Sequence, residues 1–336
     1  MVLDGQLLGG RYRVSGLLGE GAASIVYCAE SQLFGQVAVK VLREAVRAEA
    51  QAVARFMAEA HATSAINHPN VVRVLDVGSH DELPFLVMEL CEGDTLRSIV
   101  DQRGALGVSY ACELCQQVLD GLSAAHAIGI VHRDLTPANV VVSHPTPERP
   151  LAKVLDFGVA KRMLGASSRD DAVFGTPGYM APEQVQLGRV DHRADVYAVG
   201  AVLYELLTGR TPFRGDSAAE VMNQIVSRPP MPLMAFDRSL SRELDALVRT
   251  CLAKNPIDRP ASARELRDRL APFVTKLSIP AAGSMHPLSQ EPVPLVAKRG
   301  PETQAVPLVM RPRNDANPRP RLELLTDSIV DDDELS

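Results

Sequence analysis

Three polar residues near the middle of the chain have the types and spacing needed to accept a proton and hold a divalent cation. Asp134 stands five residues before Asn139 in IVHRDLTPANVVV, and Asp156 follows a short apolar run in VLDFGVAK, seventeen residues beyond Asn139. A carboxylate can accept a proton from a hydroxyl group, and carboxylate and amide oxygens are the hard ligands that Mg²⁺ prefers. Asp134 is therefore the candidate proton acceptor, and Asn139 and Asp156 are the candidate metal ligands.

Two earlier stretches could hold phosphate groups. LGEGAASIVY contains Gly19 and Gly21 between two expected strands, where backbone N–H groups can approach phosphate oxygens, although Ser24 stands where a third glycine would be expected. QVAVKVL places Lys40 on a strand with apolar neighbours, nineteen residues before Glu59 on an expected helix, which permits an ion pair between the two. Taken alone, the glycines are more typical of an ordinary hairpin turn, and the lysine is more typical of a solvated strand residue.

Taken in order, these stretches resemble a eukaryotic-like bacterial serine/threonine protein kinase. The matching motifs span about four-fifths of the chain, residues 11–273, and are the Gly-rich loop, VAVK, HRDLTPAN, DFG, GTPGYMAPE, DVYAVGAVLYELLTGRTPF and NPIDRP. The resemblance implies an α+β, bilobal fold, with a small antiparallel β-rich N-lobe carrying one main helix and a larger helical C-lobe. It also implies ATP between the lobes, Mg²⁺ or Mn²⁺ as the metal, and transfer of the γ-phosphate to Ser/Thr hydroxyls of protein substrates in intracellular signalling.

The resemblance assigns roles to residues at matching positions. Asp134, Lys40, Asn139 and Thr136 would be catalytic, Glu59 would pair with Lys40, Glu183 would pair with Arg259, and Asp195 would be structural. The backbone of Glu89 and Cys91 would contact the base, with Met88 behind it. The whole implied ATP site consists of Leu18, Gly19, Glu20, Gly21, Ala22, Ala23, Ser24, Ile25, Val26, Ala38, Lys40, Met88, Glu89 and Cys91.

Thr136 departs from the pattern, because most related loops carry a lysine there that reaches the γ-phosphate. The loss of one charged hydrogen bond to a developing oxyanion costs on the order of 2–4 kcal/mol, or roughly 30- to 1,000-fold in rate. Since Asp134, Asn139, Asp156 and Lys40 are all retained, we expect a slower enzyme. A pseudokinase scaffold, which binds nucleotide or partners without efficient catalysis, stays open as the alternative.

Arg133, beside the proton acceptor, indicates control by an anion on the following loop. The candidates are Ser167, Ser168 and the already negative Asp170, which lies six residues before Thr176. Thr176 itself lies in the stretch that resembles the Ser/Thr-specific, peptide-positioning segment. Small-molecule phosphotransferases share a similar catalytic loop but lack this segment, so a protein kinase is favoured. The alternative for SSRDD is a solvated surface loop.

The hydrophobic pattern indicates where the elements lie. Residues 11–40 alternate as antiparallel strands, residues 44–66 are helical, and two strands flank a turn containing Gly78 and Asp81. Helical periodicity then runs to about residue 273, with short strands at 140–142 and 153–155. We therefore expect an N-terminal extension (1–10), a kinase domain (11–275, with an N-lobe of 11–90 and a C-lobe of 91–275), and a Pro-rich, disordered tail (276–336).

Composition narrows the function classes. The chain is 46% hydrophobic and 23% charged, with a net charge of −6, no Trp and no long basic run, which argues against a nucleic-acid partner. We expect no membrane span and a cytoplasmic location with reduced thiols, because the five cysteines are scattered. Cys112 and Cys115 form a C-x-x-C that is either half a metal or redox site or, as the helical periodicity favours, part of the core. Self-association for autophosphorylation and a partner docked on the tail are further hypotheses.

Overall fold

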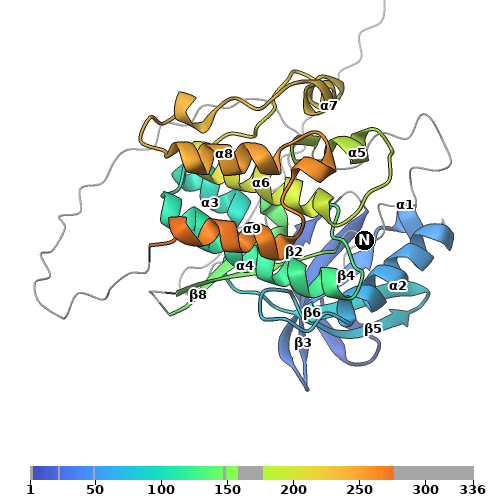
Figure 1. Cartoon of the computed structure of the whole chain (residues 1–336). Coiled ribbons are helices and arrows are strands. Elements are labelled where there is room, and N and C mark those ends of the chain that lie inside the picture. Colours follow the sequence, from blue (N-terminus) through green and yellow to red (C-terminus); the bar gives the residue numbers. More distant parts are fainter. Residues whose placement is uncertain (1–2, 22, 48–49, 147–148, 158–176, 276–336) are drawn as a thin grey trace, which may run out of the picture.

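The computed structural model describes residues 3–21, 23–47, 50–146, 149–157 and 177–275, except for the side chains of Arg55 and Glu59. Two lobes are evident in Figure 1, where the blue and cyan strands gather below the green-to-orange helices. This arrangement confirms the predicted bilobal α+β fold. The tail and the segment between the metal-binding loop and residue 177 lie outside the described residues, so the predicted disorder of residues 276–336 stays a prediction.

The N-lobe is a six-stranded antiparallel sheet with two helices. Its strand order is β1-β2-β3-β4-β6-β5, so each strand has an antiparallel neighbour and the sheet is assembled from sequential hairpins apart from the β4–β6 pair. The elements are β1 (Leu7–Leu8), β2 (Tyr12–Glu20), β3 (Ser24–Ser31), β4 (Gly35–Leu42), α1 (Glu44–Arg47), α2 (Ala50–Ser64), β5 (Val74–His80) and β6 (Leu83–Glu89).

Two apolar layers explain why this sheet forms. The alternation in β2 and β3 sends Tyr12, Val14 and Tyr27 into one cluster with Phe85, on one face of the sheet. On the other face, Phe56 and Ala60 of α2 pack against Leu86 and Met88. Since both faces are covered, β4 and β6 read as almost continuous apolar runs.

Two details of the N-lobe differ from the sequence expectation. Gly78, expected in the turn, lies inside β5, where an added Cβ would come within 2.5 Å of the Phe85 ring; the turn is made by Asp81 and Glu82, both with positive φ. Residues 3–10, which belong to the expected extension of residues 1–10, contribute β1 and place Leu3 and Leu8 in the same core as Tyr12. The packing of these apolar side chains makes that segment part of the lobe.

The C-lobe is mostly helical, with one small sheet in the order β7-β8-β9 at its boundary with the N-lobe. Helix α6 passes through its centre and is buried along almost its whole length, as the apolar segment 196–207 predicted. The elements are β7 (Asp94–Thr95), α3 (Leu96–Arg103), α4 (Val108–Ala127), η1 (Pro137–Asn139), β8 (Val140–Thr146), β9 (Arg149–Val154), η3 (Pro177–Tyr179), α5 (Pro182–Val185), α6 (Arg193–Thr208), α7 (Ala218–Ser227), η4 (Leu233–Ala235), α8 (Arg242–Cys251), η5 (Pro256–Asp258), α9 (Ala263–Leu270) and η6 (Ala271–Phe273).

Backbone hydrogen bonds join the two lobes behind the expected cleft. The Val72 N–H donates to the Val154 carbonyl at 2.9 Å, and the Val154 N–H donates to the Asn70 carbonyl at 2.8 Å. Gly121 on α4 allows this approach, because a Cβ there would lie 2.8 Å from the Asn70 oxygen. The segment after α2 is thereby attached to β9, which leads directly into the candidate metal-binding loop.

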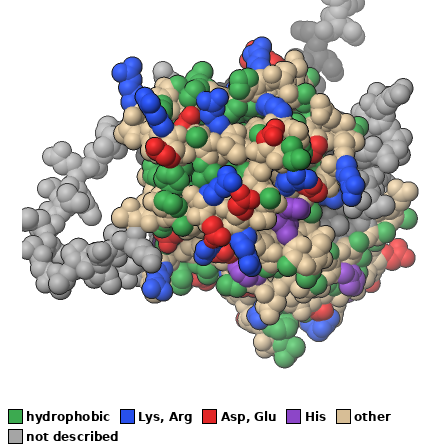
Figure 2. All heavy atoms as spheres, in the orientation of Figure 1, with side chains coloured by type: hydrophobic (Ala, Val, Ile, Leu, Met, Phe, Trp, Pro, Cys, Tyr) green, Lys and Arg blue, Asp and Glu red, His purple; other side chains and the backbone are tan. Residues whose placement is uncertain are grey.

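The surface of the helical lobe carries both signs of charge. Figure 2 shows Lys and Arg side chains interspersed with Asp and Glu over the face that it presents. Several of these charges form exposed pairs, such as Arg267 with Asp120 at 3.1 Å. Among the described residues, no helix has both the length and the apolar character needed to cross a bilayer.

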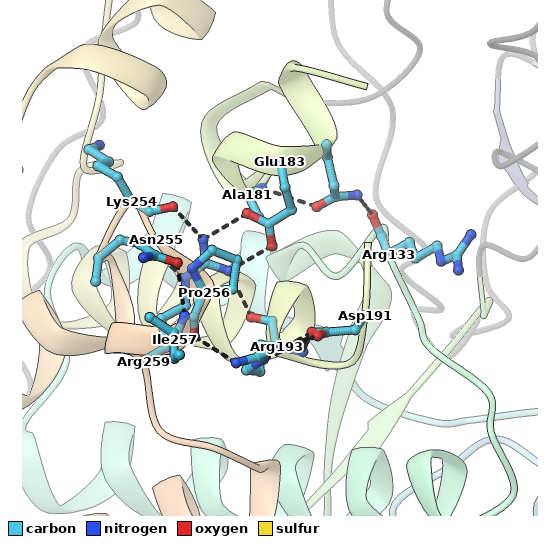
Figure 3. Close-up of polar contacts among 12 residues, drawn as sticks. Arg133, Ala181, Glu183, Asp191, Arg193, Lys254, Asn255, Pro256, Ile257 and Arg259 are labelled. Atoms are coloured by element: carbon cyan, nitrogen blue, oxygen red, sulfur yellow. Dashed lines mark hydrogen bonds and ion pairs between the residues drawn. The ribbon is translucent and has the colours of Figure 1, made fainter. Parts of the chain in front are cut away.

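Arg259 forms a buried ion pair with Glu183 that connects distant parts of the C-lobe, as the family resemblance implied. Its two terminal nitrogens each donate to a Glu183 carboxylate oxygen at 2.7 Å (Figure 3), and its side chain is fully buried. The same guanidinium also donates to the carbonyls of Ala253, Arg193 and Lys254. All five donors of the fork thus find acceptors, which is what makes a buried charge tolerable.

The three thiols of the C-lobe core, those of Cys112, Cys115 and Cys251, provide a first test of this packing. Burial raises the pKa of Cys112 and of Cys251 to about 12, and that of Cys115 well above its usual value. Because the thiolate is the reactive form, we expect iodoacetamide at about pH 8 to leave these three residues unmodified in the native protein. Peptide mass spectrometry would measure the labelling, with the guanidinium-denatured chain as the positive control. Rapid native labelling of Cys112 would contradict the core assignment of the C-x-x-C pair.

Arg259→Lys tests the buried ion pair. A lysine keeps the charge but loses the fork, so we expect the free energy of unfolding to fall by about 2–3 kcal/mol. The matched control is Arg249→Lys, since Arg249 is half-exposed and lies 3.9 Å from Asp245; its cost should stay under about 0.5 kcal/mol. Because the chain has no Trp, urea unfolding is best followed by far-ultraviolet circular dichroism. Equal losses in the two variants would show that the fork contributes nothing.

Candidate active site

Lys40 of the N-lobe and Asp156 of the C-lobe meet in an ion pair between the lobes. Lys40 lies on β4 between Val26 on β3 and Leu86 on β6, so its side chain leaves the middle of the sheet and is nearly buried. Its Nζ lies 2.9 Å from Oδ1 of Asp156, which follows β9. Glu59, the predicted partner of Lys40, belongs to α2, but its side chain lies outside the described residues.

Asn139 connects the two candidate loops. Its Nδ2 donates to the Asp134 carbonyl at 2.8 Å, and its own carbonyl accepts from the Leu155 N–H at 2.8 Å. The first bond fixes the amide so that its nitrogen faces the loop, which leaves the oxygen as the atom to be offered to a cation. The three residues predicted from spacing alone, Asp134, Asn139 and Asp156, are therefore held at one place.

His132 links these loops a second time from inside the core. Its Nε2 donates to the Leu155 carbonyl at 3.0 Å, so its Nδ1 is the acceptor for the Asp134 N–H at 3.2 Å. The ring is buried and lies 4.8 Å, centroid to centroid, from the ring of Phe157. The backbone on both sides of the candidate metal ligands is thus fixed by the core.

Asp195, predicted as structural, lies beneath the catalytic loop at the start of α6. Its carboxylate accepts from the N–H groups of His132 at 2.9 Å and Arg133 at 2.8 Å, and from Nε2 of His126 at 2.7 Å. Burial acts to raise the pKa of Asp195, but the hydrogen bond and charge of His126 and the surrounding donors hold it below its usual value. The carboxylate therefore stays ionised and keeps its three donors.

The expected adenine site is an apolar layer between the lobes. Leu18, Ala38 and Met88 are buried in one cluster, with Val26 and Leu155 packed against it. Ile25, by contrast, packs in the cluster on the other face of the sheet, because alternate strand residues face opposite sides. The side chain of Ile25 therefore faces away from the expected adenine site, and its place in the ATP site stays a prediction.

The expected phosphate loop is the β2–β3 hairpin. Gly19 and Glu20 end β2, and the Gly21 N–H donates to the Ser24 carbonyl at 2.8 Å. Arg43 holds the turn from behind: its guanidinium donates to the Gly21 carbonyl at 2.8 Å and Glu20 at 2.5 Å, and its N–H donates to the Ala23 carbonyl. Ala22 lies outside the described residues. Sequence reasoning missed Arg43, because no motif marks it.

The segment between the lobes is fixed by a second unpredicted pair. The Glu89 carboxylate accepts from Lys153 Nζ at 2.6 Å and from the Arg73 N–H at 2.8 Å. Since Lys153 belongs to β9, this pair ties the end of the N-lobe sheet to the C-lobe sheet. Burial, and then the charge of Glu89, raise the pKa of Cys91 to about 11. Its thiol therefore stays neutral beside the expected position of the adenine base.

A buried network supports the peptide-positioning segment at Tyr179. The Arg97 guanidinium lies 2.9 Å and 3.1 Å from the two Glu205 carboxylate oxygens, and the Tyr179 hydroxyl contacts both residues. Tyr179 and Glu205 are buried, which raises the pKa of the tyrosine well above its usual value. These residues come from α3, η3 and α6, so only the folded chain shows that they act together.

Thr136 and Arg133 flank the candidate proton acceptor, Asp134, at two residues and one residue in the sequence. Thr136 is nearly buried as the residue before η1, and its carbonyl accepts from the Asn139 N–H at 3.0 Å. Arg133 has a positive φ of 66°, a conformation that costs a non-glycine residue energy unless its neighbours hold it. The remaining regulatory candidates lie outside the described residues: Ser167, Ser168, Asp170 and Thr176.

The chemistry of the donors fits a nucleotide with its metal. Asn139 and Asp156 supply the oxygen ligands that suit Mg²⁺ when phosphate oxygens complete the coordination shell, and Lys40 supplies a cation beside them. The N-lobe thus brings an apolar layer, a backbone-rich turn and a cation to the side that faces Asp156. This combination is the one that phosphoryl transfer from a nucleoside triphosphate requires.

Comparison with known proteins agrees with this site. Residues 12–270 match the protein kinase domain family. The chain is 40% identical over 275 residues to the serine/threonine-protein kinase pkn3 of Myxococcus xanthus, covering 79% of this chain and 50% of that protein. It is also 40% identical over 268 residues to the serine/threonine-protein kinase PknB of Mycobacterium tuberculosis, covering 77% and 42%. The chain thus spans half or less of the length of these relatives.

Solved structures show the same architecture. The crystal structure of the Mycobacterium tuberculosis PknI kinase domain aligns with a TM-score of 0.65 at 30% identity, over 81% of this chain and all of that one. The crystal structure of Rad53 1-466 in complex with AMP-PNP aligns with a TM-score of 0.66 at 26% identity, over 79% of this chain and 66% of that one. These matches confirm the resemblance inferred from the motifs. The chain belongs to the protein kinase family.

Proposed function

We propose that this chain is a serine/threonine protein kinase, which transfers the γ-phosphate of ATP to Ser/Thr hydroxyls of protein substrates and of itself. The observation that carries the proposal is the meeting of Lys40 and Asp156 at 2.9 Å beside an Asn139 that is bonded to both loops. The choice of Ser/Thr rests on the similarity to pkn3 and PknB, both named as serine/threonine kinases.

Four side chains divide the work. Bound ATP would supply the phosphoryl group, and Mg²⁺ or Mn²⁺ would offset the negative charge of its phosphates. Asn139 and Asp156 would hold the metal through their oxygens, while Lys40, now paired with Asp156, would bind phosphate oxygens. Asp134 would orient the acceptor hydroxyl and accept its proton. None of these roles needs a residue that the chain lacks.

The base would lie between Leu18, Val26 and Ala38 above and Leu155 below, with Met88 behind it. The backbone of residues 89 and 91 would form hydrogen bonds with the edge of the adenine base. Because Glu89 is held by Lys153 from the other lobe, that backbone is fixed before the nucleotide arrives. The β2–β3 hairpin would cover the phosphates with its backbone N–H groups.

Thr136 would leave the enzyme active but slow. Its side chain is nearly buried, and no charge is supplied at the position where most relatives carry a lysine. Arg133 and a negative group on the following loop would tune this activity, with Asp170 giving a basal level and Ser167 or Ser168 adding control. Self-association and a partner for the tail belong to the same proposal.

The test is incorporation of radiolabelled phosphate from ATP with Mg²⁺ or Mn²⁺, into the chain itself and into casein. We expect Asp134→Asn to lower the rate roughly 100- to 10,000-fold, because the proton acceptor is lost. Thr136→Lys should raise it by roughly 30-fold or more, because a cation is returned to the phosphate side.

Matched controls make the result specific. Asp81→Asn makes the same chemical change on a β5–β6 turn whose carboxylate is almost fully exposed, and should leave the rate unchanged. Thr136→Val keeps the shape but removes the hydroxyl. If neither the wild type nor any variant, including Thr136→Lys, incorporates radiolabelled phosphate, the proposal is overturned. The pseudokinase scaffold would then be the better interpretation. Label that persists in Asp134→Asn would remove Asp134 from the mechanism.

A further inference from the structure

Gln184, on α5, forms a direct bridge from the peptide-positioning segment to the catalytic loop. Its Nε2 donates to the Arg133 carbonyl at 2.7 Å, and its Oε1 accepts from the Ala181 N–H at 3.0 Å. Figure 3 draws both bonds, which link the labelled residues Ala181 and Arg133 through this one amide. The two residues that it joins lie about fifty positions apart in the chain, so no local pattern marks the bridge.

The Arg133 carbonyl matters because it belongs to the peptide unit that carries the N–H of Asp134. That N–H donates to His132 Nδ1 at 3.2 Å, while the Arg133 N–H donates to Asp195 at 2.8 Å. Arg133 also has a φ of 66°, so its backbone depends on outside contacts to stay in place. Gln184 holds the carbonyl of Arg133, while Asp195 holds its N–H.

The position of α5 does not depend on this amide alone, although its Oε1 caps the helix through the Ala181 N–H. The neighbouring Glu183 is fixed to the core by two bonds to Arg259, each of 2.7 Å. Adjacent side chains on α5 therefore make separate contacts: Glu183 bonds to Arg259 in the helical core (Figure 3), and Gln184 bonds to the catalytic loop. A change at Gln184 should release the loop while leaving the helix attached.

We propose that Gln184 is a positioning residue, which acts through the Arg133 carbonyl to fix the orientation of Asp134. This inference rests on the proposed kinase activity. Because α5 contains the end of the segment that would hold the protein substrate, the same amide couples the position of that segment to the position of the proton acceptor.

The amide can be replaced by groups of nearly equal size with predictable hydrogen bonding. In Gln184→Glu, an ionised carboxylate would face the Arg133 carbonyl and repel it, whereas the protonated carboxyl group could donate to it. Partial burial and the facing carbonyl would act to raise the pKa of this carboxyl above the ordinary Glu value of about 4.3, against the Ala181 N–H, which would act to lower it. Gln184→Met has no donor at any pH. The two variants therefore differ in how their activity depends on pH.

The experiment measures kcat and KM for casein and ATP from about pH 6 to about pH 8, each normalised to the wild type at the same pH. We expect both variants to lower kcat about tenfold at about pH 8, with KM for ATP unchanged. For Gln184→Glu the loss should shrink as the pH falls, because protonation restores a donor; for Gln184→Met it should stay constant. Gln186→Glu and Gln186→Met are the matched controls on the exposed residue that ends the same helix, and should behave as wild type.

Thermal unfolding of each variant separates positioning from folding. A loss of kcat with an unchanged melting temperature, and with the stated pH dependence, supports the proposal. Equal, pH-independent losses in both variants, or a loss that follows a lowered melting temperature, would make the role merely structural and overturn it. Wild-type activity in variants of Gln184 would overturn it as well. An inactive wild type would instead refute the proposed function, and this inference with it.

Discussion

The buried carboxylate of Asp195 holds the catalytic loop, and most of the active site depends on it. It accepts two N–H groups from the loop backbone and one from His126, so its charge is met by three donors in a place that excludes water. A buried charge is stable only when it is satisfied in this way, which makes the loop geometry and the carboxylate mutually dependent. Because Asp195 lies on α6, its hydrogen bonds attach the loop to a helix that is buried along almost its whole length.

From this anchor, contacts extend outward in a short series. His132 and Asn139 connect the loop to the strand end before Asp156, and Asp156 meets Lys40 of the N-lobe. A separate contact, between Gln184 and Arg133, reaches the α5 side. Active-site residues from both lobes are thus related through a few polar bonds, which are directional and so fix orientation better than apolar packing alone.

Other contacts fix the lobes themselves. The pair of Glu89 and Lys153 joins the two sheets beside the expected base, and the backbone bonds between Asn70, Val72 and Val154 join them behind it. In the C-lobe, the Arg259–Glu183 pair holds α5 to the core. Each is a contact between segments far apart in the sequence, so each is formed only when the whole domain is folded.

The sequence by itself determined the family and the two lobes, and it indicated the residues that we propose carry the chemistry. Asp134, Asn139 and Asp156 were identifiable because the spacing of reactive residues within a loop is local and survives in the linear chain. Tertiary structure alone decided how they are held: Gln184, Arg43 and Lys153 occupy positions that no motif marks, because their partners are distant. It also decided that Gly78 lies in a strand, where the Phe85 ring packs against it. The side chain of Ile25 lies on the other face of the sheet, because alternate residues of a strand face opposite sides. Residues that meet from distant segments have no fixed separation in the sequence. Their contacts can therefore be recognised only in the folded chain.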